Sequence, residues 1–240
     1  SKIDGHRGKR IMFKKISKRF RKLVEVSKSK KIESLDEGIQ KVKLNCTTKF
    51  DESIDVSFKL NLKNKKEETT LRTIVNLPNG NGKKIKIAVL CEENKIKEAK
   101  DSGADLSGSD SLINDISSGK INFDKLIATP PMMSKISKLG KILGPKGLMP
   151  NPKLGTVTND IKSSVKAIKS GQIEIRNDKE GNIGSSIGKK SFTDLKIKEN
   201  YNVFIQTILK EKPNGVKGDF ILSAFLTSTM GVSYKLKLKG

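Results

Sequence analysis

Tryptophan is absent from this chain of 240 residues, histidine occurs once and cysteine occurs twice. The single histidine, His6, has no second imidazole with which to share a proton or a metal ion, which argues against histidine-based catalysis. Cys46 and Cys91 lack the spacing of metal ligands, so we interpret them as free thiols in a reducing compartment. No stretch approaches 18 consecutive apolar residues, and no membrane-spanning helix is therefore expected.

Groups that could carry out catalysis are also missing. The sequence offers no nucleophile with a base partner, no pair of carboxylates with an arguable geometry and no set of metal ligands. Gly184–Ser191 resembles a phosphate-binding loop, but one residue too few separates its glycines and Lys190 stands where Ser or Thr is required. We therefore expect no enzyme activity, no cofactor, no metal and no small-molecule substrate. A nucleotide-dependent enzyme built on the α/β part of the chain is the alternative.

Positive charge, in contrast, is abundant. Lys and Arg total 49 against 26 acidic residues, which gives a net charge of +23. This charge exceeds what solubility requires and indicates a polyanionic partner, with nucleic acid first and an acidic membrane surface second. Charge alone would produce a general polyanion binder with equal affinity for any RNA of a given length, and that alternative stays open.

Residues 1–31 form a basic N-terminal arm that holds 13 Lys or Arg and two acidic residues. Within the arm, residues 7–24 place apolar side chains near helical spacing, which predicts a basic amphipathic helix. Three interpretations are open: an arm that contacts RNA, a solvated tail, and an organellar targeting peptide. We prefer the first.

The segment after the arm predicts a helix and then a strand. Ser34 and Glu37 have the spacing of a capping box, which begins a helix that runs to about Leu44. Residues 54–62 alternate apolar and polar side chains, which predicts a strand with one buried face. No partner strand for it occurs before residue 72.

Residues 85–141 change to an α/β pattern. The nearly continuous apolar run at 85–90 is typical of a buried parallel strand. Further strands are expected at 104–106 and 123–128, and helices at 92–102, 110–118 and 131–141. This alternation predicts a small parallel sheet with right-handed crossovers.

The C-terminal third has antiparallel character. Helices are expected at 159–170, with Thr158 as the N-cap, and at 193–212; strands are expected at 172–176, 182–188, 219–227 and 232–239. One of these strands can supply the partner that strand 54–62 lacks. We therefore predict a fold of class α/β and α+β: a discontinuous α+β domain of residues 32–71 plus 158–240, and an inserted α/β domain of residues 72–157. Two linkers would then lie side by side and form a hinge.

The most unusual stretch is Leu139–Val157, which has three glycines and three prolines between Gly144 and Gly155. Glycine permits left-handed backbone and proline fixes φ, so the stretch specifies one irregular path. Three lysines lie on it: Lys141, Lys146 and Lys153.

Residues 128–158, ATPPMMSKISKLGKILGPKGLMPNPKLGTVT, closely resemble the signature of the bacterial-type ribosomal protein L1 family, the RNA-binding proteins of the large subunit's mobile stalk. The resemblance implies a Rossmann-like inserted domain and a structural role in the large ribosomal subunit. It further implies binding to stalk ribosomal RNA, support of stalk movement, and release of deacylated transfer RNA from the exit site. Members of the family also repress translation of their own messenger RNA, and the resemblance implies this as an additional expectation for this chain.

The RNA contacts of the family fall on three segments of this sequence. A Lys-Phe-Asp-Glu-Thr motif matches Lys49–Ser53, a Gly-Lys-x-Ser-Phe run matches Gly188–Phe192, and a Ser-Thr-Met-Gly turn matches Ser228–Gly231. Lysine can neutralise phosphate, an exposed phenyl ring can offer a flat face to a base, and a carboxylate can accept from a 2′-hydroxyl. The resemblance thus implies RNA-binding roles for Lys49, Phe50, Glu52, Ser53, Lys189, Lys190, Ser191, Ser228, Thr229, Met230 and Gly231. Without it, Phe50 would be a core residue and residues 228–231 a plain hairpin turn.

The chain departs from the family pattern in two places. Lys63–Lys65 and Arg72–Thr73 replace Asp-Pro-Arg and Arg-Gly motifs at the domain junction, and Gly184–Ser185 replaces a His-Ala pair. These departures and the basic arm favour a ribosome in the mitochondrial matrix over one in a bacterial cytoplasm, and both settings stay open.

Overall fold

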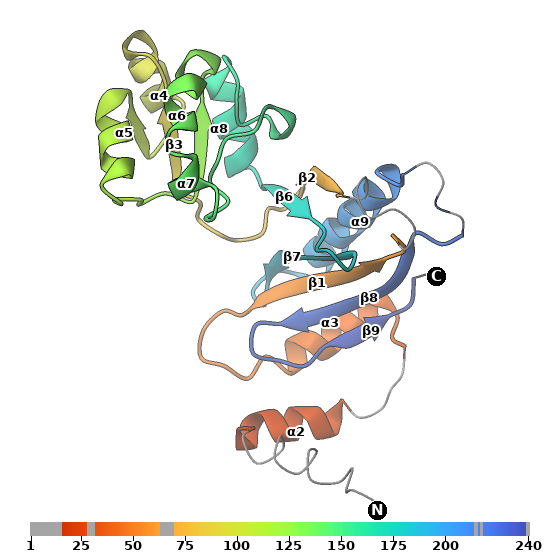
Figure 1. The fold of residues 1–240 in the computed structure, drawn as a ribbon. Coiled ribbons are helices and arrows are strands. Elements are labelled where there is room, and N and C mark those ends of the chain that lie inside the picture. The colour runs from red at the N-terminus through yellow and green to blue at the C-terminus, as the bar shows by residue number, and fades with distance from the viewer. Residues whose placement is uncertain (1–15, 28–31, 63–69, 214–215, 217, 239–240) are drawn as a thin grey trace, which may run out of the picture. The chain divides into compact units, whose positions relative to one another are not determined.

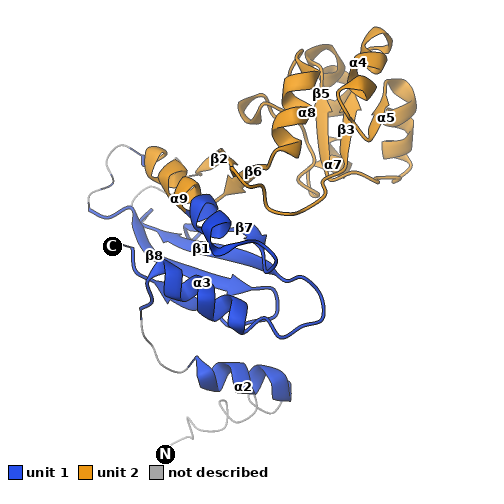
Figure 2. Ribbon diagram, turned by 180° about the vertical axis from the view of Figure 1, so that it is seen from behind, with its two compact units in different colours: residues 1–69, 177–201, 212–240 blue, residues 70–176, 202–211 orange. Residues whose placement is uncertain are grey.

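The computed structural model describes residues 16–27, 32–62, 70–213, 216 and 218–238. The chain divides into two compact units (Figure 2). The first unit comprises residues 1–69, 177–201 and 212–240, and the second comprises residues 70–176 and 202–211. The chain therefore leaves the first unit and returns to it, as the sequence predicts for a discontinuous domain with an insertion.

Four antiparallel strands form the sheet of the first unit, in the order β7-β1-β8-β9 (Figure 1). They span Asn182–Lys189 (β7), Ser53–Leu60 (β1), Ile221–Ser228 (β8) and Tyr234–Leu236 (β9). β1 lies between β7 and β8 and pairs with both, so its two partners come from the C-terminal third of the chain. The predicted origin of the partner strand is confirmed.

Two helices cover one face of this sheet: α3 (Leu35–Leu44) and the N-terminal part of α9 (Asp194–Lys210) (Figure 2). The inward residues of β1 are at most 1% exposed: Ile54, Val56, Phe58 and Leu60. The Phe58 ring lies 5.8 Å from the ring of Tyr201 on α9. On α3, a Cβ at Gly38 would lie 2.5 Å from Leu236 Cδ2 of β9, so a larger residue there would displace this leucine side chain.

The capping box predicted at the start of α3 is present. Ser34 Oγ accepts from the Glu37 backbone N–H (3.3 Å), and Glu37 Oε2 accepts from the Ser34 backbone N–H (3.2 Å). Upstream, α2 (Lys18–Val26) begins at its N-cap, Ser17. This helix confirms the later part of the one predicted at 7–24; residues 1–15 and 28–31 of the predicted arm lie outside the described residues.

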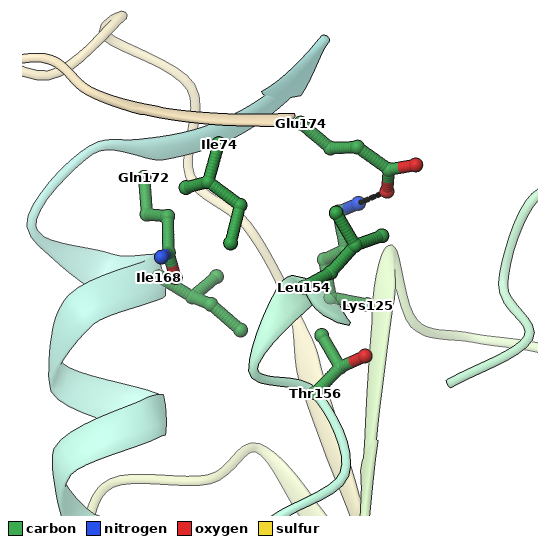
Figure 3. A pocket seen from close by; sticks show the side chains of 7 residues that line it. All are labelled: Ile74, Lys125, Leu154, Thr156, Ile168, Gln172 and Glu174. Atoms are coloured by element: carbon green, nitrogen blue, oxygen red, sulfur yellow. Dashed lines mark hydrogen bonds and ion pairs between the residues drawn. The ribbon is translucent and has the colours of Figure 1, made fainter. Parts of the chain in front are cut away.

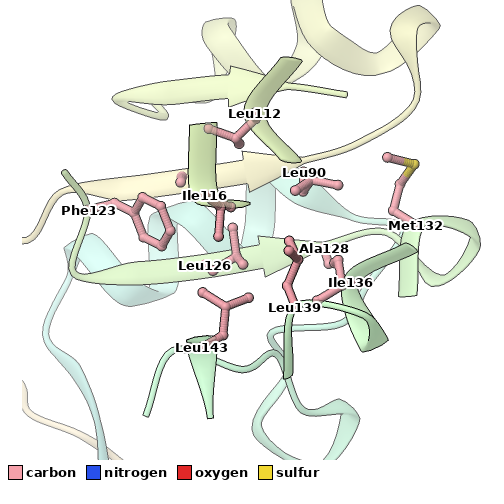
Figure 4. Packing of buried hydrophobic residues seen from close by; sticks show 11 residues of the cluster. Leu90, Leu112, Ile116, Phe123, Leu126, Ala128, Met132, Ile136, Leu139 and Leu143 are labelled. Carbon is pink, nitrogen blue, oxygen red and sulfur yellow. The ribbon is translucent and has the colours of Figure 1, made fainter. Parts of the chain in front are cut away.

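Three parallel strands form the sheet of the second unit, in the order β4-β3-β5, which confirms the predicted small parallel sheet. They span Leu106–Gly108 (β4), Ile87–Leu90 (β3) and Lys125–Ala128 (β5). Every residue of β3 is buried, as expected of a strand covered on both faces. On one face, residues of β3 and β5 pack against α5 (Asp110–Ser117), α6 (Met133–Ser137) and α7 (Gly140–Leu143) (Figure 4). The 3-10 helix η2 (Pro130–Met132) leads into α6.

The other face of the parallel sheet packs against α4 (Ile96–Asp101), which follows the 3-10 helix η1 (Glu93–Lys95), and α8 (Ile161–Lys169). The apolar stripe of α8 joins Val89 and Ile127 in one buried core. The expected domain boundary at residue 157 is therefore corrected, because α8 belongs to the second unit. Its N-cap is Asp160, which accepts from Ser163 N at 3.0 Å, and the expectation of Thr158 as N-cap was wrong.

Two short strands of the second unit, β2 (Arg72–Asn76) and β6 (Gln172–Arg176), pair antiparallel. Glu174 on β6 accepts from Arg72 Nε at 2.7 Å and from Lys125 Nζ at 3.3 Å. The strand predicted at 172–176 is thus confirmed, and its partner is the strand that follows residue 71, where the first linker was expected. The chain first returns to the first unit after Arg176, not at the Gly/Pro stretch. The divergent segment Lys63–Lys65 lies outside the described residues.

The Gly/Pro stretch packs onto the second unit. It contains the 3-10 helix η3 (Pro152–Leu154), whose Leu154 is buried, and Gly155 follows with a φ of 65°. The next residues run beside β5, where Ala128 N donates to Thr156 O at 2.9 Å. The predicted lysines of the stretch are exposed: Lys141, Lys146 and Lys153. The stretch is therefore an anchored segment that presents its basic side chains to solvent.

Gly171, between α8 and β6, tests how closely the backbone there packs against the turn at Leu77–Gly80. Its φ is +114°, and an added Cβ would lie 2.5 Å from the Gly80 Cα and 2.9 Å from the Leu77 carbonyl oxygen. We expect Gly171→Ala to lower the free energy of unfolding by about 3 kcal/mol, because backbone atoms must move apart. Gly119→Ala is the control, since Gly119 also has a positive φ (+83°) but no atom within 4 Å of the added Cβ, and it should cost only about 1 kcal/mol. Urea unfolding followed by circular dichroism measures both; equal losses would contradict the clash.

Candidate nucleic-acid interface

Three segments meet at one end of the first unit's sheet. Because β7 and β8 run antiparallel to β1, their last residues lie beside its first residues: Lys189 pairs with Ser53, and Ser228 pairs with Ile54. The segments that adjoin these strand ends are residues 46–52, 190–192 and 229–231. The structure therefore brings together the three motifs that the sequence analysis selected, and we call this region the strand-end surface.

Glu52 lies inside this region and ties two of its segments together. Its side chain is 0% exposed. Oε1 accepts from the backbone N–H and the hydroxyl of Thr48, at 3.3 and 2.8 Å, and Oε2 accepts from the backbone N–H of Met230 at 3.0 Å. The expectation that this carboxylate accepts from a 2′-hydroxyl is therefore corrected, because both of its oxygens bond to the protein and neither reaches the surface.

The environment of Glu52 keeps it charged. Burial on its own raises the pKa of this carboxyl group, but the hydrogen bonds from Met230, from Thr48 and from the Ser228 hydroxyl outweigh the burial. The net result is a pKa below its usual value of 4.5. Glu52 is thus a buried carboxylate whose charge is balanced by hydrogen-bond donors.

The turn after β8 is fastened to the start of β1. Thr229 N donates to Ser53 O at 3.1 Å, and Ser53 N donates to Thr229 Oγ1 at 2.9 Å. Ser228 is 4% exposed, so its expected RNA contact is also corrected. A Cβ at Gly231 would lie 2.3 Å from Ser228 Oγ, which explains why glycine occupies the end of this turn. Ser228 and Gly231 therefore shape the turn.

The segment after β7 is fastened in the same way. Lys190 N donates to Glu52 O at 2.8 Å, and Lys190 Nζ donates to Cys46 O at 2.9 Å. Asp51 accepts from the backbone N–H and hydroxyl of Ser191, at 3.0 and 2.7 Å, and the Ser191 hydroxyl is the main reason why the pKa of Asp51 lies below its usual value. The Ser53 hydroxyl accepts from Lys189 Nζ at 2.8 Å. Three segments thus form one hydrogen-bonded framework.

Two apolar side chains stand exposed on this framework. Phe50 is 52% exposed and Met230 is 47% exposed, although both are large hydrophobic residues. Lys49, Lys190, Ser191 and Thr229 are exposed around them. Exposed apolar groups can stack on bases, and the surrounding ammonium and hydroxyl groups can bind phosphate and sugar. The surface has the chemistry that a folded RNA requires.

Sequence reasoning missed three contributors to this surface. Thr48 directly precedes the predicted motif and Asp51 lies within it. Their roles as hydrogen-bond partners depend on contacts that the motif alone does not specify. Arg19 donates to Thr47 Oγ1 at 3.1 Å and to Met230 O at 2.8 Å. Nothing in the local pattern around Arg19 distinguishes it from the other basic residues of the arm.

Other candidate sites receive less support. Residues 182–189 form an antiparallel strand, β7, which agrees with the rejection of a phosphate-binding loop at Gly184–Ser191. In the second unit, a small pocket is lined by Ile74, Lys125, Leu154, Thr156, Ile168, Gln172 and Glu174 (Figure 3). The lining residues Lys125 and Glu174 pair with each other, so this pocket offers no unpaired cation to a nucleotide phosphate.

Two further searches cover the described residues alone. Among them, no group of three or more His, Cys, Asp or Glu side chains could hold a metal ion. No helix within the described part of the chain has the length and apolar character needed to cross a bilayer.

Comparison with known proteins points to one protein family. Residues 41–232 match the ribosomal protein L1p/L10e family. The protein named "large ribosomal subunit protein uL1" from Pelagibacter ubique is 60% identical over 223 residues, which cover 92% of this chain and 97% of that protein. The protein of the same name from Rickettsia typhi is 47% identical over 222 residues, which cover 92% of this chain and 94% of that protein. The one from Rickettsia canadensis is 45% identical over 221 residues, which cover 92% of each.

The substitution Glu52→Gln tests the internal role of this carboxylate. The amide nitrogen cannot accept, so one donor loses its partner, and we expect the free energy of unfolding at pH 7 to fall by about 1–3 kcal/mol. The pKa of Glu52 is lowered by folding, so its stabilisation is complete above about pH 4.5 and is lost as the pH falls through the folded-state pKa. The gap between wild type and variant should therefore narrow below pH 4.5.

Urea unfolding followed by circular dichroism at several pH values measures this gap. Asp51→Asn is the matched control, because it removes an exposed carboxylate of the same surface and should cost less. Equal losses for the two variants, or a gap for Glu52→Gln that does not change with pH, would show that the buried carboxylate does not hold the turn.

Proposed function

Since this chain belongs to the ribosomal protein L1p/L10e family, we propose that it is a structural constituent of the large ribosomal subunit and binds large-subunit RNA through the strand-end surface. The family resemblance carried by residues 128–158 is thereby confirmed. The matched relatives bear the name of a large-subunit protein, and this chain covers nearly their whole length, which supports the same role here.

The observation that supports this site is the exposure of Phe50 and Met230 on a rigid framework. Single exposed apolar side chains are common on protein surfaces, but two of them on one hydrogen-bonded framework support an interaction site at this place. Hydrogen bonds fix the chain next to both side chains: Glu52 accepts from the Met230 N–H, and Asp51, the residue after Phe50, accepts from the Ser191 N–H. Little ordering is therefore needed on binding, which favours specificity for one folded RNA.

The remaining contacts supply affinity. Lys49 and Lys190 can neutralise phosphates, and the hydroxyls of Ser191 and Thr229 can bond to sugar or phosphate oxygens. The ammonium groups of Lys189 and Lys190 already donate to the Ser53 hydroxyl and to the Cys46 carbonyl oxygen, so each contributes less to phosphate binding than Lys49. The proposal keeps Lys49, Phe50, Ser53, Lys189, Lys190, Ser191, Thr229, Met230 and Gly231 as the RNA-facing set, with Glu52 and Ser228 as internal supports.

The finer roles are proposals that rest on the family resemblance. They are binding to the mobile stalk, movement with it, release of deacylated transfer RNA at the exit site, and repression of the protein's own messenger RNA. The exposed lysines of the Gly/Pro stretch on the second unit are compatible with transfer RNA as a second partner. Neither a small-molecule substrate nor a membrane is part of the proposal.

The relatives also bear on the cellular setting. All three are bacterial proteins, which supports a bacterial-type ribosome. The bacterial cytoplasm is therefore the setting we now favour over the mitochondrial matrix, because divergent junction motifs and a basic arm are weaker arguments than relatives of this similarity.

A salt titration of RNA binding tests the proposed site. We expect Met230→Asp to weaken binding to the stalk RNA of a bacterial large subunit by at least tenfold, because a carboxylate then faces the RNA. We expect Phe50→Ala to cost about 1–3 kcal/mol through lost stacking. The preference for stalk RNA over a length-matched scrambled duplex should persist at high salt in wild type and disappear in Met230→Asp.

Leu195→Asp is the control for this experiment. Leu195 is 65% exposed in the first turn of α9, where an aspartate is favourable, so binding should stay at the wild-type level. Equal affinity of wild type for both RNAs, with a steep salt dependence, would instead support the general polyanion binder.

A further inference from the structure

The N-terminal helix α2 is attached directly to the strand-end surface. Arg19 on this helix donates from Nη1 to Thr47 Oγ1 (3.1 Å) and from Nη2 to the Met230 carbonyl oxygen (2.8 Å). One guanidinium group thus bonds to two of the three segments that build the surface. The planar, two-pronged donor geometry of arginine suits such a bridge, and lysine cannot reproduce it.

The faces of α2 have distinct characters. Leu23 is 6% exposed, and Phe20 and Val24 are half-buried, so these residues form the covered face. Lys18, Arg21 and Lys22 are exposed. At about 100° per residue these three cations lie on the side of the helix opposite the covered face. The helix therefore turns a basic face to solvent while its apolar face is covered.

The basic face has one acidic neighbour. Glu25 lies one turn beyond Arg21 and Lys22, at the end of α2 farther along the chain from Arg19. Lys18, next to Arg19 in sequence, lies about two turns from Glu25, whereas Arg21 and Lys22 each lie one turn from it. The three cations outnumber this one acid, so the exposed face of α2 carries net positive charge.

We propose that α2 is a second wall of the RNA-binding surface, in which Lys18, Arg21 and Lys22 contact the RNA backbone and Arg19 is the positioning residue that holds the helix beside Met230. The inference rests on the proposed function, since it assigns further contacts to the same RNA. A polyanion is the partner that this wall fits, because it presents three cations next to a surface suited to bases. Arg19 acts through the protein: its contacts are to Thr47 and Met230.

The salt dependence of binding separates this wall from a merely basic tail. Each phosphate contact adds about 0.7 to 0.9 to the slope of log affinity against log salt. Neutralising Lys18, Arg21 and Lys22 together to Gln should lower the slope for the stalk RNA by about 2 to 3. Neutralising Lys97, Lys100 and Lys162 to Gln, three exposed lysines of the second unit, removes the same charge and should leave the slope at the wild-type value.

Arg19 gives the sharper test of positioning. Arg19→Ala removes one charge, but it should lower the slope by about 2 to 3, as the triple variant does, because the helix is no longer held. Arg19→Lys keeps the charge and loses the bridge, so it should lower the slope nearly as much. Combining Arg19→Ala with the triple variant should lower the slope little further. Circular dichroism and thermal unfolding check that the first unit stays folded.

The outcomes separate this inference from the function on which it rests. A wild-type slope in the triple variant overturns the second wall, and a change of 1 or less in Arg19→Ala overturns the positioning role. In either case the proposed function survives if wild type still prefers stalk RNA and Met230→Asp erases that preference. If wild type shows no preference at all, it is the proposed function that fails.

Discussion

The hydrogen bonds of the Glu52 carboxylate are the interaction on which the proposed binding surface depends. They join Thr48, just before β1, to Met230, just after β8, although most of the chain lies between these residues. A buried carboxylate is costly unless donors surround it, and here donors from both segments do so. The carboxylate therefore fixes the turn that presents Met230, and it does so from beneath the surface.

The strand order of the first unit brings the Thr48 and Met230 segments together. β1 is paired on both edges by strands from the C-terminal third, so loops distant in sequence meet at one end of the sheet. The second unit is built from the segment between them, around its own parallel sheet. One chain thus combines a preorganised surface, which we propose binds RNA, with a second unit built around its own sheet, and the high net charge suits a polyanionic partner.

The sequence predicted those features that leave a local pattern. Alternation marked β1, a continuous apolar run marked β3, and the Ser34–Glu37 spacing marked the start of α3. The domain boundary near α8 could not be predicted in this way. The apolar stripe of α8 fits either domain, and only its packing against Val89 and Ile127 shows that the helix belongs to the second unit. For the same reason Glu52 was misassigned: a motif indicates that a carboxylate matters, whereas burial determines what it touches. The bridge from Arg19 has no local signal at all.

The most direct test of the account is cross-linking of the protein to a stalk RNA that carries photoreactive nucleotides, followed by identification of the joined peptides. The account predicts cross-links in the peptides that contain Phe50 and Met230, from neighbouring nucleotides, and their persistence at high salt. Cross-links confined to basic segments elsewhere, such as the Gly/Pro stretch or α8, would contradict it. The RNA would then be held by charge, and the framework around Glu52 would have no part in recognition.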